Sequence, residues 1–190
     1  INNGRIVIGS NVQSGAAMRV DGAEDAVTRN YGVIDVNGRG TALPVVNAGS
    51  GGKVGNAGSI NLNGDNGTGL LVIADDGHLA HAWSSGPITI AGNANAVSGT
   101  RNTAVWVNGI DSRVASAEIS GPITLNGAGA IGIRAEANAT VNVARSAVPT
   151  SNNSPDQNTI LAIGPNAHIQ FPAHGSSGLT GHNPALFPVQ

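Results

Sequence analysis

The chain has no cysteine, few aromatic residues and few charges. Without cysteine it can form no disulfide, no thiolate metal site and no cysteine nucleophile. Charged residues make up 11% of the chain and the net charge is −2, which excludes the basic stripe of an electrostatic nucleic-acid binder. No apolar run approaches the roughly 20 residues that span a bilayer, so we expect no membrane insertion of this segment.

What the chain does contain is glycine, asparagine, alanine and β-branched residues. It has 28 glycines and 40% hydrophobic residues, so its composition is not that of a disordered chain. This composition is typical of many short strands joined by Gly/Asn turns. The chain begins at Ile1 without a charged segment and an apolar segment of the signal-peptide type, so we expect it to be part of a longer or processed protein.

One motif recurs, with the approximate form Asn-x-Gly-x-Ile-x-(Val, Leu or Ile)-x-Gly. Its copies occupy residues 2–9, 30–38, 56–64, 86–92 and 121–127. The leading glycines of successive copies are 28, 26, 28 and 35 residues apart. Each copy alternates apolar and polar residues, which predicts a strand with one buried face. The glycines on either side are expected to permit the turns.

Two further short strands are expected in each period. The second lies at Met18–Val20, Leu43–Val45, Leu70–Ile73, Val105–Val107, Ile131–Ile133 and Leu161–Ile163. The third is centred on Val27, Val54, Leu79, Val114, Val141 and Ile169. Three strands in a period of about 28 residues predict a parallel β-solenoid of about six coils, which is stabilised by stacking. A β-sandwich or jelly roll is the alternative all-β fold, but neither predicts a near-constant step.

The differences between copies predict the domain organisation. We expect a β-helix over residues 1–171, with longer loops near residues 93–103 and 145–159. Residues 172–190 are expected to be a Pro/Gly-rich tail or the start of a truncated further coil. The equivalent isoleucines of the repeat should stack in one interior column, formed by Ile34, Ile60, Ile88 and Ile123.

The segments Ile131–Val143 and Val105–Val114, together with Ile119-Ser120-Gly121, resemble the coils of autotransporter (type V secretion) passenger domains of the pertactin type. This resemblance implies a right-handed parallel β-helix on the outside of a Gram-negative cell. It also implies a C-terminal outer-membrane barrel, which we do not expect within these residues. Many such passengers are adhesins or mediate self-association. Some carry Arg-Gly-Asp, but here Arg39-Gly40 is followed by Thr41, so integrin recognition by that tripeptide is not supported.

Candidate catalytic and metal-binding residues are few. The acid pair in Asp75-Asp76-Gly77-His78 suits general acid–base chemistry, but the same residues are typical of a turn, which is the interpretation we favour. Glu24-Asp25 is interpreted as a solvated pair. His78 and His81 would point to opposite faces of a strand, so no metal site is expected. Gly49–Lys53 lacks the spacing of a Walker motif. We therefore predict no catalytic residue, metal or cofactor.

The sequence favours a binding surface over a catalytic site. In the second strand we expect the outward positions Arg19, Pro44, Leu71 or Val72, Trp106, Gly132 and Ala162. An outward Trp106 can stack on a sugar ring or anchor a protein, with Arg19 and Arg134 on or beside the same sheet. The alternative is that the 93–103 loop covers Trp106. Trp83 shares the parity of Leu79 and is expected in the core or in turn packing.

These observations favour a non-catalytic segment of a secreted bacterial surface protein, either an adhesin or a self-association module. Its expected partner is a host or matrix glycan or protein, or a second copy of itself, and not a nucleic acid. One alternative is the structural stalk of an autotransporter whose activity, such as a protease, lies outside this fragment. A second is a β-helix polysaccharide lyase or hydrolase.

Overall fold

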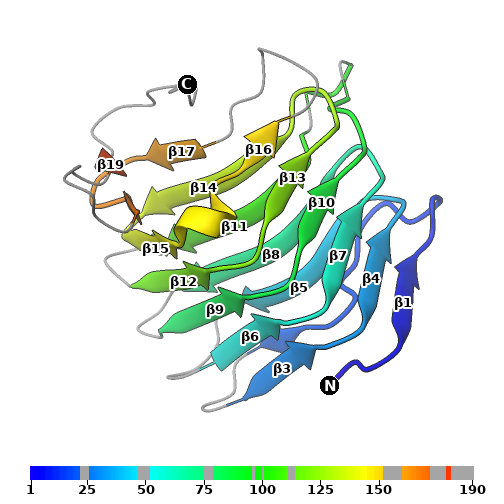
Figure 1. The fold of residues 1–190 in the computed structure, drawn as a ribbon, viewed down its shortest axis with the longest axis horizontal. Coiled ribbons are helices and arrows are strands. Elements are labelled where there is room, and N and C mark those ends of the chain that lie inside the picture. The colour runs from blue at the N-terminus through cyan, green and yellow to red at the C-terminus, as the bar shows by residue number, and fades with distance from the viewer. Residues whose placement is uncertain are drawn as a thin grey trace.

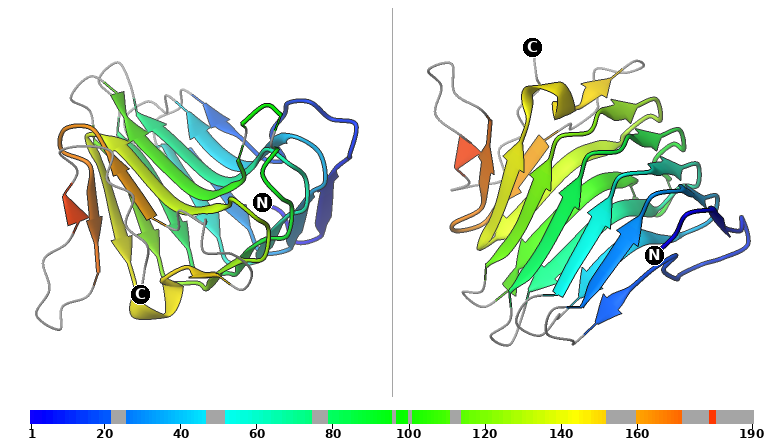
Figure 2. Two further views of the ribbon diagram at one scale, coloured as in Figure 1. Left: turned by 90° about the horizontal axis from the view of Figure 1, so that it is seen from above. Right: turned by 60° about the horizontal axis from the view of Figure 1, so that its bottom comes forward.

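A computed structural model describes residues 1–21, 26–46, 52–74, 79–95, 97–99, 101–110, 114–151, 160–171 and 179–180. These residues form a parallel β-helix with three strands in each coil, and the coils stack side by side along one axis (Figures 1 and 2). Neighbouring strands are parallel throughout, except where β18 meets β19. The predicted fold class is therefore confirmed, and the β-sandwich alternative is wrong.

Each coil contributes one strand to each of three sheets. The first sheet contains β1 (Arg5–Ile8), β4 (Val33–Val36), β7 (Ser59–Leu62), β10 (Ile88–Ile90), β13 (Ile123–Leu125) and β16 (Thr150–Ser151). The second contains β2 (Val20–Asp21), β5 (Gly40–Val46), β8 (Gly67–Ala74), β11 (Thr103–Gly109), β14 (Ile131–Ala137) and β17 (Ile160–Ile163). The third contains β3 (Val27–Asn30), β6 (Gly52–Asn56), β9 (Ala80–Ser84), β12 (Ala115–Ile119), β15 (Ala139–Val143), β18 (His168–Gln170) and β19 (Leu179–Thr180).

The first sheet is built by the recurring motif. Ile34 pairs with Ile60, Ile60 with Ile88, and Ile88 with Ile123, and all four side chains are at most 1% exposed. The predicted interior column is confirmed. The residue that follows Ile6 or one of these four isoleucines lies on the outer face of the sheet. These residues form one row across the strands: Val7, Asp35, Asn61, Thr89 and Thr124.

The glycines of the motif form two columns at the ends of the first sheet, where the backbones of successive coils come very close. A Cβ atom on Gly86 would lie 1.8 Å from the carbonyl oxygen of Gly58, and one on Gly92 would lie 1.8 Å from that of Gly64. Among the described glycines, the residues with positive φ are Gly15, Gly99, Gly129 and Gly164, and none of these belongs to either column. The recurring glycines therefore serve close coil stacking and not a left-handed turn.

The asparagine that opens the early copies of the motif forms a buried ladder between coils. Asn2 donates from Nδ2 to Asn30 Oδ1 at 2.7 Å, Asn30 donates to Asn56 Oδ1 at 2.8 Å, and Asn56 donates to Ser84 Oγ at 3.1 Å. Asn30 and Asn56 are fully buried. Because a buried amide without partners is costly, these bonds stabilise the stacking where the third sheet leads into the first.

In the third sheet, three of the six residues predicted at strand centres are exposed. Val54, Val141 and Ile169 are buried as expected, but Val27, Leu79 and Val114 are 39%, 56% and 48% exposed. The first two inward positions of β9 and of β12 are instead occupied by alanines, Ala80, Ala82, Ala115 and Ala117, and the third inward position of β12 is Ile119. These alanines fill the interior at this level of the coils, whereas Leu79 and Val114, directly before Ala80 and Ala115, remain exposed.

The expected loops and tail lie only partly within the described residues. The connection from β10 to β11 is long, as the 35-residue step predicts, and includes residues 93–95, 97–99 and 101–102. Residues 145–159 are not a simple loop, because they include the short 3₁₀ helix η2 (Arg145–Ala147) and β16, while residues 152–159 lie outside the described part. Most of the 172–190 tail also lies outside it. Within the described ranges, no helical segment is both long and apolar enough to cross a bilayer.

Candidate functional site

Trp106 stands on the outer face of the second sheet, as its alternation with buried Val105 and Val107 predicts. In register, it lies between Leu71 on β8 and Arg134 on β14. The predictions of Gly132 and Ala162 as outward positions in this row are wrong. Arg134 and Leu161 occupy the row instead, because the row crosses β14 two residues after Gly132 and crosses β17 one residue before Ala162.

The side chain of Trp106 belongs to a compact cluster with two residues of β14. The guanidinium carbon of Arg134 lies 4.4 Å from the centre of a Trp106 ring, and Trp106 Nε1 donates to Glu136 Oε2 at 2.9 Å. Arg134 Nε donates to Glu136 Oε1 at 2.7 Å. The cation–π contact and the ion pair hold the half-buried indole in one orientation. A ligand that uses Arg134 must therefore compete with Glu136.

Arg19 does not join this cluster. It precedes β2, at the opposite side of the sheet from β14, and three strands separate β2 from β14. Its guanidinium pairs with the exposed carboxylate of Asp21 at 2.8 Å. Of the three predicted ligand-binding residues, the structure brings Trp106 and Arg134 together and leaves Arg19 apart.

Trp83 is also on an outer face, so the prediction that it packs in the core or a turn is wrong. Trp83 and Leu79 do alternate with the same buried residues, but Leu79 is itself exposed. The buried side chains of β9 are Ala80, Ala82 and Ser84. The signal that sequence analysis missed was the alternation Ala-His-Ala-Trp-Ser, in which the small residues face inward.

The indole of Trp83 leans across the neighbouring strand β6. It fills the space above Gly55, where a Cβ atom would lie 2.2 Å from Trp83 Cε2 and Cζ2. The guanidinium carbon of Arg29 lies 5.7 Å from the Trp83 ring centre on the far side of that strand. His81 stacks beside Trp83 with a ring separation of 6.3 Å, and its Nδ1 lies 2.9 Å from Ser116 Oγ. Burial lowers the pKa of His81, which favours the neutral ring.

Beside Trp83, the third sheet carries a groove of about 560 Å³. Trp83, Glu118, Asn142 and Gln170 occupy the same register row on β9, β12, β15 and β18 and form its floor. The wall follows the corner where these strands end and includes Ser85, Ser120, Ala144 and Phe171. Since the floor crosses four neighbouring strands, the groove runs along the stacking axis. The helix η2 follows Ala144 at this corner (Figure 1).

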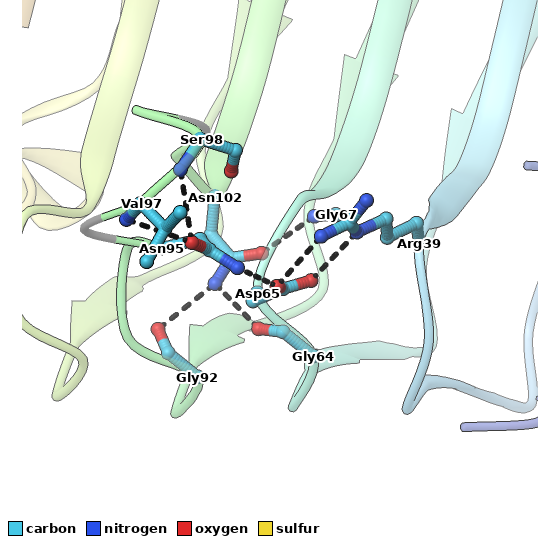
Figure 3. A network of polar contacts seen from close by, with 9 residues as sticks. All are labelled: Arg39, Gly64, Asp65, Gly67, Gly92, Asn95, Val97, Ser98 and Asn102. Atoms are coloured by element: carbon cyan, nitrogen blue, oxygen red, sulfur yellow. Dashed lines mark hydrogen bonds and ion pairs between the residues drawn. The ribbon is translucent and has the colours of Figure 1, made fainter. Parts of the chain in front are cut away.

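A second polar cluster lies where the first sheet leads into the second (Figure 3). Asn102 is buried and donates from Nδ2 to the carbonyl oxygens of Gly64 and Gly92, at 2.7 and 2.8 Å, while its Oδ1 accepts from the Gly67 amide. Asp65 accepts two hydrogen bonds from Arg39, both at 3.1 Å, and one from Asn95 at 2.7 Å. These bonds attach the long connection between β10 and β11 to the coils on either side.

The hydrogen bonds from Arg39, and next that from Asn95, lower the pKa of Asp65 to about 2. A carboxyl group with this pKa stays ionised at neutral pH and is unsuited to donate a proton as a general acid. We therefore assign Asp65 a structural role in anchoring the connection.

The depressed pKa of Asp65 predicts a pH dependence of stability. Because the folded-state pKa lies below the ordinary value of 3.8, its contribution is present above about pH 4 and is lost as the pH falls towards 2. The melting temperature of the wild-type protein should fall more between pH 5 and pH 2, on the order of a few degrees, than that of Asp65→Asn. An equal fall in melting temperature in the two proteins would contradict a stabilising role of the Asp65 carboxylate.

The described residues contain no group of three or more His, Cys, Asp or Glu side chains arranged to bind a metal ion. The acidic motif at residues 75–78 and the Glu24-Asp25 pair lie outside the described residues, as do residues 49–51 of the glycine-rich segment. Comparison of the chain with protein-family models, with curated proteins and with solved structures gives no match.

Proposed function

We propose that this chain is a non-catalytic binding segment of an exported bacterial cell-surface protein, of the adhesin type, and that it binds a host or matrix component through the outer faces of its sheets. The resemblance of its coils to autotransporter passenger domains supports the cellular setting. The placement of its aromatic side chains supports the binding role.

The observation that carries the proposal is that both tryptophans of the chain stand on outer faces, each beside an arginine. The buried hydrophobic core of the described residues consists of Ile, Val, Leu and Ala alone, so neither tryptophan is needed to fill it. Trp and Arg are the residue types that contribute most to binding interfaces.

The backbone that carries these side chains is suited to recognition because it is preorganised. Each interior strand of the second and third sheets is hydrogen-bonded to a neighbour on both sides, and every one of these pairings except that of β18 with β19 is parallel. Side chains on such a sheet lose little further conformational freedom when a ligand binds, which lowers the entropic cost of binding.

The proposal is tested by measuring adhesion of the purified chain to immobilised matrix glycans, to matrix proteins and to itself. Replacement of both tryptophans, Trp83→Ala with Trp106→Ala, should weaken adhesion about tenfold or more. Tyr31→Ala removes an aromatic side chain that is 51% exposed and lies on neither face, and should leave adhesion unchanged.

Thermal unfolding of the double variant controls for loss of the fold. Adhesion by a folded double variant at the wild-type level would contradict the proposal. A wild-type chain that adheres to none of these surfaces would favour the structural-stalk alternative.

A further inference from the structure

We infer that the groove beside Trp83 on the third sheet binds a neutral oligosaccharide, which lies along the stacking axis of the coils. This inference rests on the proposed binding function and assigns it a site and a ligand class. It also moves the principal site from Trp106, on the second sheet, to the outer face of the third sheet.

The shape of the groove fits a chain of sugar rings. Its floor is a single row of four side chains, one from each of four successive coils, and strands in a sheet are spaced about 4.8 Å apart. This spacing is close to the repeat of a linear chain of pyranose rings. Successive rings would therefore meet successive floor residues.

The chemistry of the floor also fits a sugar. Trp83 supplies an aromatic surface at one end, and Phe171 supplies a second at the other. Between them, the exposed side chains of Glu118, Asn142 and Gln170 offer amide donors, amide acceptors and a carboxylate. Apolar surfaces that alternate with a few fixed polar groups match the C–H faces and hydroxyl groups of a pyranose.

The charge of the groove favours a neutral ligand over an acidic one. Among the described side chains that line it, Glu118 alone carries a charge at neutral pH. Arg29 lies beyond Trp83, separated from the floor by the indole that covers Gly55. A uronate, sialic acid or sulfate placed on this floor would face the carboxylate of Glu118, and no basic side chain is among the residues that line the groove.

The hydrogen bonding of the sheet favours a saccharide over an extended peptide. A peptide that adds to a sheet as a further strand needs an unpaired edge. Here β9, β12 and β15 are each paired on both sides, so the floor offers side chains only. A sugar makes its hydrogen bonds through hydroxyl groups to side chains and needs no such edge.

The test uses the two tryptophans as separate reporters, because the chain contains no others. Trp106→Phe leaves Trp83 as the sole indole, and Trp83→Phe leaves Trp106. The probes are neutral oligosaccharides of glucose, galactose, mannose and N-acetylglucosamine, with a heparin-derived oligosaccharide as the acidic comparison. At least one neutral probe should change the fluorescence of Trp106→Phe and leave that of Trp83→Phe unchanged.

Affinity measured by calorimetry gives the second readout. Trp83→Ala should raise the dissociation constant of that probe about tenfold or more, and Asn142→Ala should raise it severalfold. Tyr31→Ala, which removes an exposed aromatic side chain that does not line the groove, is the control and should leave the dissociation constant unchanged. Circular dichroism and thermal unfolding establish that each variant retains the fold.

The outcomes separate this inference from the proposed function. Adhesion to a protein, or to the acidic probe alone, would overturn the neutral-sugar inference and leave the binding function standing. A neutral sugar that still binds Trp83→Ala with wild-type affinity would overturn the site. A chain that binds neither sugars nor matrix components would overturn both the inference and the function.

Discussion

Gly92→Ala is expected to destabilise the protein by about 3 kcal/mol or more, at or above the upper end of the usual cost of overpacking. The new Cβ atom would lie 1.8 Å from the carbonyl oxygen of Gly64 in the preceding coil and 2.7 Å from that of Asn63. Both contacts are with backbone atoms, so no side-chain rotation relieves them. Two coils would have to separate at this corner, which would disturb the hydrogen bonds that the amides of Ala91 and Gly92 donate to Leu62 O.

The matched control for this variant is Gly9→Ala. Gly9 occupies the same glycine column at its first coil, and no atom outside its chain neighbours lies within 4 Å of a Cβ placed there. Its unfolding free energy should change by no more than about 0.5 kcal/mol. Chemical denaturation of the two variants measures the difference, and an equal effect in both would show that coil stacking does not select glycine.

Ile88→Ala is expected to cost about 2–5 kcal/mol, the usual range for truncating a buried isoleucine. Ile88 is 1% exposed and lies between Ile60 and Ile123 in the interior column. A cavity at this position would be bounded by relatively rigid strands on both sides, so little relaxation is expected to fill it.

Thr89→Ala is the comparison for this second variant, because Thr89 is the next residue of β10 and faces outward. It should change the unfolding free energy by less than about 1 kcal/mol. A cost for Thr89→Ala as large as that for Ile88→Ala would reverse the assignment of the two faces of this strand.

The first sheet could be predicted from the sequence because its signals agree with one another. Strict alternation places Ile60 and Leu62 inward, and the near-constant step aligns successive copies. The reason for the glycines could not be predicted in the same way. Nothing in one copy of the motif shows that Gly92 will lie against Gly64, because that contact exists only once the coils are stacked.

The third sheet could be predicted only in part, because alanine occupies most inward positions of β9 and β12. Ala82 and Ala117 occupy the positions where Val54 and Val141 lie in other coils, and alanine carries little periodic signal. The search for large apolar residues therefore selected Leu79 and Val114, which are exposed. For the same reason, the sequence predicts Trp83 in the core or in turn packing and gives no indication of the groove beside it.

The candidate site on the second sheet was predicted more successfully in orientation than in contacts. Alternation places Trp106 outward, but it gives no indication that Glu136 will engage both Trp106 and Arg134. Arg19 is predicted as a ligand-binding residue because it lies on the same sheet as Trp106. How far apart two residues of one sheet lie depends on the strand order, which places β2 at the opposite side from β14.

The central claim, that outward side chains of successive coils lie in register, is tested most directly by an engineered disulfide. The chain has no cysteine of its own, so the pair Thr89→Cys with Thr124→Cys has no background. Paired residues on adjacent strands lie about 5 Å apart, within the range that a disulfide spans, so oxidation should cross-link this pair readily. The pair Thr89→Cys with Thr150→Cys spans two strand spacings, about 10 Å, and should not cross-link. Peptide mapping that finds the second cross-link in place of the first would contradict the stacked register on which both binding faces depend.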